Sequence, residues 1–99
     1  MEQFVVISEQ GPHWDPARAM REQEGWGDHA RFMNQVADER IVVLGGPLRH
    51  PDRHRALLVV RGSDEATLRA RLAADPWMVS GVLQIVAFYS WEILLGELP

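Results

Sequence analysis

The chain has 99 residues, of which 46% are hydrophobic and 24% charged, with a net charge of −4 and no cysteine. This composition fits one globular domain over residues 1–99; the acidic balance argues against a nucleic-acid partner, and the lack of cysteine excludes disulfides and thiolate chemistry. Acidic Glu2 replaces the basic start of a signal peptide, and no apolar run nears the ~20 residues of a membrane span, so we expect a cytoplasmic protein with no membrane partner.

The first half of the chain predicts a strand, a surface segment and a helix. Residues 4–7 form a β-branched and aromatic run that is typical of a strand, and Gly11-Pro12 ends it. The polar stretch 13–23 is expected at the surface. Residues 26–38 then place apolar side chains at helical spacing. The predicted apolar face of this helix consists of Trp26, His29, Ala30, Met33, Val36 and Ala37.

The second half predicts two strands, a helix and a last strand, which completes the order β-α-β-β-α-β. The strands are expected at residues 41–44, 56–60 and 83–89, with the last continuing toward Trp91. Gly45-Gly46-Pro47 is expected to stop the second strand. Ser63 or Asp64 can cap the helix, which must end by Asp75 because Pro76 disfavours helical dihedrals in the residue before it.

Apolar residues occupy both faces of all four predicted strands. A half-exposed antiparallel sheet would instead alternate apolar and polar residues. Two helices can cover one face of such a sheet, and a large exposed apolar face marks an interaction site. The sequence therefore predicts a homodimer of the α+β barrel type, packed sheet against sheet. The alternative is that the terminal segments fold back over the open face.

Two residues are candidates for proton-transfer chemistry. His29 lies on the apolar face of the predicted helix, and the unperturbed histidine pKa of about 6.5 suits proton exchange near neutrality. The alternative interpretation is that His29 is a core histidine whose hydrogen bonds are satisfied within the fold. Asp75, before Pro76, is either an ordinary helix cap or a carboxylate that orients an imidazole and stabilises its charged form.

The remaining polar and glycine-rich segments carry weaker signals. Gly45-Gly46-Pro47 is either a tight exit from a strand or a backbone wall beside a ligand, and it lacks the spacing of a phosphate-binding loop. A basic cluster is interpreted as a solvated turn rather than an anion site. That cluster consists of Arg49, His50, Arg53, His54 and Arg55. The four histidines show no compact metal-ligand spacing, so we expect neither a metal nor another cofactor.

An ordered set of segments resembles the YCII-related (YciI-like) family. The segments are Trp26–Met33, Val42–Leu48, Ala74–Trp77, Val82–Leu83 and Ser90–Leu94. The resemblance implies a ferredoxin-like βαββαβ fold with a four-stranded antiparallel sheet, assembled as a dimeric α+β barrel. It also implies a pocket in which His29 and Asp75 form a catalytic pair. The chain departs from the family at Glu39-Arg40, where relatives commonly have Glu-Gly, which questions the local backbone geometry.

These observations predict an enzyme that uses a His-Asp pair, without a cofactor, for lyase, isomerase or hydrolase chemistry. The family includes a lyase that removes chloride from a hydroxylated aromatic, but most members have no assigned reaction, so this substrate does not transfer. The expected apolar walls suit a small metabolite, aromatic ones included. The expected substrate-binding residues are Trp26, Met33, Gly45, Gly46, Pro47, Pro76 and Trp77. Two alternatives stay open, a non-catalytic ligand-binding or sensing dimer with the same pocket, and a structural dimer with a filled interior.

Overall fold

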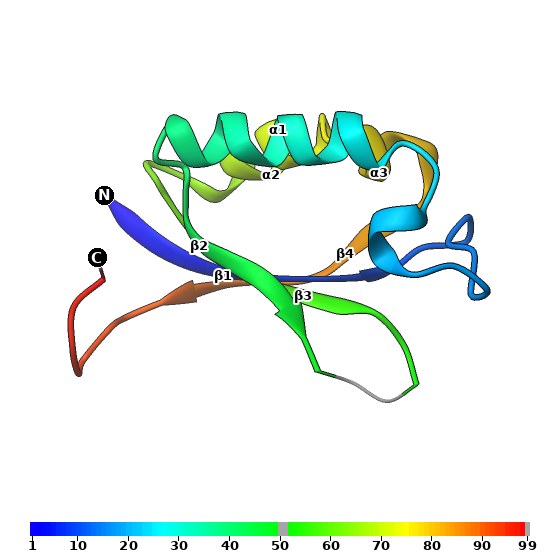
Figure 1. Cartoon of the computed structure of the whole chain (residues 1–99). Helices are drawn as coiled ribbons and strands as arrows, with labels where there is room; N and C mark the ends of the chain where they lie inside the picture. The colour runs from blue at the N-terminus through cyan, green and yellow to red at the C-terminus, as the bar shows by residue number, and fades with distance from the viewer. Residues whose placement is uncertain (50–51, 99) are drawn as a thin grey trace.

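A four-stranded antiparallel sheet forms one layer of the molecule, and the helices form a second layer on one of its faces (Figure 1). The computed structural model describes residues 1–49 and 52–98. In this part of the chain the elements are β1 (Glu2–Gln10), η1 (Met20–Glu22), α1 (Trp26–Asp38), β2 (Val42–Leu48), β3 (Arg55–Gly62), α2 (Glu65–Ala73), α3 (Pro76–Ser80) and β4 (Leu83–Trp91). The strand order β2-β3-β1-β4 is compatible with a ferredoxin-like fold. The predicted α+β class and antiparallel sheet are confirmed.

The core lies between the helices and the face of the sheet that they cover. Phe4 and Val6 of β1 point to this face, and the register pairs them with Val60 and Leu58 of β3. Phe32 of α1 packs in the same cluster, although the predicted apolar face of the helix did not include it. The other core members are Val36, Val42, Leu68, Leu72 and Phe88. Burial of side chains of this size contributes roughly 1.5–3 kcal/mol each and holds the helical layer on the sheet.

The prediction that Gly45-Gly46-Pro47 stops the second strand is wrong. β2 continues through these residues to Leu48, and Pro47 pairs with Ala56 of β3. Proline has no backbone N–H to donate to a neighbouring strand, so within sheets it occurs at edge strands. β2 is an edge strand of this sheet. Residues 45–47 are therefore part of a strand, and the two glycines leave its backbone without side chains there.

The helix boundaries follow local chemistry, part of which the sequence had indicated. Asp64 caps α2 by accepting a hydrogen bond from the Thr67 backbone N–H at 2.8 Å, and this bond lowers the pKa of the Asp64 carboxyl. Asp75 separates α2 from α3, with Pro76 at the first helical position of α3. α3 ends at Gly81, whose φ of 82° lies in the left-handed region that favours glycine.

The second face of the sheet has no helix over it (Figure 1). By register, Ile7 of β1, Leu57 of β3 and Ala87 of β4 share this face. Tyr89 is 63% exposed and pairs with Val5 on the same side. In the described chain the terminal segment does not cover this face, because Leu94 and Leu95 are themselves exposed. Both faces are thus apolar, as predicted, and one of them is open.

Arg40 carries unusual backbone geometry at the exit of α1. Its φ of 62° is in the left-handed region, and it is the one non-glycine residue with a positive φ in the described chain. An L side chain costs roughly 1–2 kcal/mol in this conformation. The sequence had singled out this position, where glycine would be unstrained.

We expect Arg40→Gly to raise the free energy of unfolding by about 1 kcal/mol, since glycine adopts a positive φ without the steric cost. Arg40→Ala is the matched control, because it removes the charge and keeps the Cβ. Urea unfolding followed by circular dichroism measures both. Equal stabilities for the glycine and alanine variants would contradict the strain.

Candidate functional site

The imidazole of His29 and the carboxylate of Asp75 form a close pair between α1 and the start of α3. The Nδ1 atom of His29 lies 2.9 Å from Oδ1 and 2.8 Å from Oδ2 of Asp75. The side chains are 12% and 2% exposed, respectively. In the described part of the chain, the Nε2 atom of His29 has no hydrogen-bond partner and is not buried, so it remains accessible. Asp75 therefore holds one ring nitrogen and leaves the other free.

Asp75 has two structural tasks at once. Its Oδ1 atom accepts a hydrogen bond from the Trp77 backbone N–H at 2.9 Å, which caps α3, while the carboxylate also accepts from His29. The sequence offered two interpretations of Asp75, a helix cap and the partner of an imidazole. The side chain makes both contacts. The cap and the histidine together fix the orientation of the carboxylate.

Trp77 supports the imidazole from behind. The indole ring is 1% exposed and stacks on His29 with ring centroids 3.9 Å apart and planes inclined by 10°. Its Nε1 atom donates a hydrogen bond of 2.8 Å to the Glu24 carbonyl, next to Gly25, which precedes the first residue of α1 and has a φ of 82°. One indole therefore fixes both the start of the helix and the plane of the ring that the helix carries.

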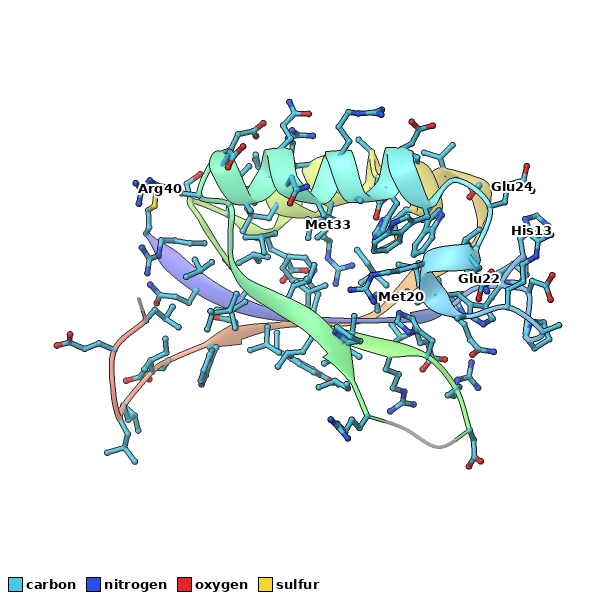
Figure 2. All side chains as sticks on the ribbon, viewed as in Figure 1. His13, Met20, Glu22, Glu24, Met33 and Arg40 are labelled. Atoms are coloured by element: carbon cyan, nitrogen blue, oxygen red, sulfur yellow. The ribbon has the colours of Figure 1, made fainter. Side chains whose placement is uncertain are left out.

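A cavity of about 370 Å³ lies beside this pair, between α1, η1 and the edge of the sheet. His29, Asp75, Trp26 and Met33 contribute to its wall on the helical side. Figure 2 shows Met33 on the sheet side of α1 and Met20 at the start of η1. Gly45, Gly46 and Pro47 of β2 line the opposite edge of the cavity. The size and largely apolar lining are typical of a small-molecule site.

Two predicted substrate-binding residues stand outside the cavity wall. Trp77 lies behind His29 rather than in the lining, and Pro76 begins α3 next to it. Their contribution is to hold the catalytic candidates in place.

A second imidazole lies in the cavity wall, that of His54, which was not predicted from the sequence. Its ring stacks on Trp14 with centroids 4.6 Å apart and planes inclined by 10°, and Trp14 in turn meets Trp77 edge to face at 6.2 Å. Burial lowers the pKa of His54, and the charge of nearby His29 lowers it further. A signal was present in the sequence, because period-two alternation places residue 54 on the same face as Ala56 and Leu58.

His54 had been grouped with a basic turn. Arg53 and Arg55 of that turn both pair with Glu9, at 2.8 and 3.0 Å, so one carboxylate is shared between these two charges. His50 of the same cluster lies outside the described residues.

Most of the segment 13–23 is exposed, as the sequence predicted, but its last residue, Gln23, is buried. Gln23 is 3% exposed, and its side chain bonds the backbone of the loop at Asp15 N, Asp15 O and Arg18 O. These hydrogen bonds hold the loop where Trp14 and Met20 pack against the buried cluster of Trp77, Val82 and Leu83. The loop is therefore an ordered wall of the site.

Neither a metal centre nor a membrane span emerges from the described residues. Across residues 1–49 and 52–98, no three His, Cys, Asp or Glu side chains gather as metal ligands. No helix in this part of the chain has the length and hydrophobicity needed to cross a membrane.

A scan against protein-family models finds no family that matches this chain, and a search of curated proteins finds no match either. The resemblance to the YCII-related family accordingly stays a prediction from the sequence.

We expect Asp75→Ala to lower the free energy of unfolding by about 2–3 kcal/mol, because it leaves the Trp77 N–H and the His29 Nδ1–H buried without an acceptor. Asp75→Asn keeps one oxygen for the cap and should cost about 1 kcal/mol. Urea unfolding of the two variants checks this order. Loss of less than 0.5 kcal/mol for Asp75→Ala, a value within the range of ordinary surface substitutions, would contradict the pairing.

Proposed function

We propose that the protein is a cofactor-independent enzyme that uses His29 and Asp75 for general acid–base chemistry on a small, apolar metabolite. The observation that carries this proposal is the free Nε2 of His29 at an apolar cavity, with Nδ1 bonded to a buried carboxylate. The resemblance of the sequence to the YCII-related family supports the same pair.

The chemistry follows from the tautomer that Asp75 imposes. A carboxylate that accepts the Nδ1 proton leaves Nε2 as a basic lone pair and stabilises the imidazolium that forms when Nε2 takes a proton. Such a base can remove a proton from a substrate carbon or hydroxyl and return it elsewhere. Lyase, isomerase and hydrolase reactions need this step, and a positioned acid or base contributes typically 10²–10⁴-fold in rate.

The alternative function is a non-catalytic binding or sensing protein with the same cavity. In this case the Nε2 atom of His29 would be a polar anchor for a metabolite and would not exchange a proton with it. The same lining residues favour both functions, so turnover is the property that separates them.

We expect His29→Gln to bind the compounds that the wild-type protein binds while losing at least about 10²-fold in turnover, because glutamine keeps hydrogen-bonding capacity and cannot act as a base. The measurement is a thermal-shift screen of small aromatic and aliphatic metabolites, with each hit then followed for product formation by NMR. Met33→Trp, which fills the cavity, is the control and should abolish the hits.

Two outcomes would contradict the enzyme. Hits that bind the wild-type protein and are never converted favour the sensing function. Hits that survive Met33→Trp show that the ligand binds elsewhere.

We further propose that two copies pair through the open face of the sheet, giving the dimeric α+β barrel. Ile7, Leu57 and Tyr89 contribute to an apolar surface that no helix covers. On the same face, by alternation from Val59, Arg61 buries its Nε atom without a hydrogen-bond partner in the described chain. A second copy would cover the apolar surface and offer that nitrogen an acceptor.

Sedimentation equilibrium at micromolar concentration should give twice the chain mass of 11.3 kDa. Leu57→Lys places a charge at the centre of the open face and is expected to give monomers. Ala70→Lys, on the exposed side of α2, is the matched control and should leave the dimer intact. A monomeric wild-type protein would contradict this assembly.

A further inference from the structure

The charges around the cavity are strongly one-sided. Among residues 1–49 and 52–98, three basic side chains line it, from Arg21, His29 and His54. The one carboxylate that these residues contribute to the lining is that of Asp75, and it is already engaged by His29 and by the Trp77 N–H. The described lining therefore offers several hydrogen-bond donors and no free acidic group.

Arg21 differs from most arginines of this chain. Six others lie within ion-pair distance of a carboxylate: Arg18, Arg31, Arg53, Arg55, Arg69 and Arg71. Arg21 forms no ion pair with any described residue, and its guanidinium lies over the Trp26 ring, 5.6 Å from the centroid. The stacking holds a cation at the cavity while leaving its fork of N–H donors available.

His54 presents the second available donor. One face of its ring is covered by Trp14, and its ring nitrogens have no hydrogen-bond partner among the residues that the structure describes. In the free protein, burial and the charge of His29 hold its pKa below the usual value, so the neutral form is favoured. A negative charge beside the ring would reverse this preference.

We propose that the natural ligand is a small organic anion with an apolar body, whose carboxylate or similar group lies against His54 and Arg21. Its apolar part would contact the methionines of the lining, Met20, Met33 and Met78, beside Nε2 of His29. A carboxylate leaving water needs charged or hydrogen-bonding partners, and guanidinium and imidazolium groups supply them. This inference names a ligand class for the cavity and rests on the proposed function.

Anion binding is then linked to proton uptake. Because the bound anion raises the pKa of His54, affinity increases as the pH falls through the bound-state pKa, and it levels off below the lower free-state pKa. Arg21 keeps its charge throughout this range. The other charged groups around His54 are His29 and Asp75 in the cavity, Glu9 with its partners Arg53 and Arg55, and Arg49 and Asp52 on the outer side.

The test compares three probes that share one ring: benzoate, benzamide and benzylamine. Each is titrated into the wild-type protein, and the histidine and methionine side-chain resonances are followed by NMR at pH 6 and pH 8. Benzoate should bind at least about tenfold more tightly than either other probe at pH 6, and its advantage should shrink at pH 8.

Two variants locate the charge. His54→Gln and Arg21→Gln should each weaken benzoate binding by about tenfold and leave benzamide binding nearly unchanged. His54→Gln should also reduce the pH dependence of benzoate binding. Arg31→Gln, on the exposed side of α1, removes one positive charge outside the cavity and should have no effect.

Equal binding of benzoate and benzamide would overturn the anion class, while the acid–base proposal for His29 would stand. Benzoate binding that does not respond to either cavity variant would also overturn it. Failure of His29→Gln to affect turnover is a separate result that bears on the proposed function alone.

Discussion

The bond between the imidazole of His29 and the carboxylate of Asp75 is the interaction on which the site depends. Asp75 is 2% exposed, and a buried carboxylate is costly unless every oxygen has a partner. Here the partners are the His29 ring and the first free N–H of α3. The need of the buried Asp75 carboxylate for hydrogen-bond partners therefore also sets the tautomer and the orientation of the His29 ring.

The surrounding aromatic residues extend this constraint. Trp77 stacks on His29, Trp14 stacks on His54, and the two indoles meet edge to face. Each histidine thus has a rigid plane behind it and a cavity in front. Gln23 holds the loop that carries Trp14, so the site is built from segments near both ends of the chain. Such preorganisation suits catalysis, since little is spent on ordering the groups when a ligand enters.

Much of the architecture was predictable because it depends on local pattern. The spacing of apolar residues predicted α1 over 26–38, and Asp64, Pro76 and Gly81 mark helix ends through capping and left-handed geometry. β2 was cut short at Gly45 because glycine and proline usually end strands, and the sequence does not reveal that this strand lies at an edge. The open face was predicted from strands that are apolar on both sides.

The candidate site was predictable only in part, because its contacts join distant segments. His29 and Asp75 emerged from residue type and from a family resemblance, whereas their bond depends on how α1 and α3 meet. His54 was grouped with charged neighbours, and its burial depends on Trp14, a residue from a loop expected at the surface. Side-chain pairs of this kind have no signature at fixed spacing.

The most direct test of this account is the tautomer of His29, measured by ¹H–¹⁵N NMR on protein labelled at the histidine ring nitrogens. The account predicts a proton on Nδ1 and an unprotonated, solvent-responsive Nε2 above the pH at which the ring becomes charged. Observation of the Nε2–H tautomer there, or an Nε2 signal that is insensitive to added ligand, would contradict it.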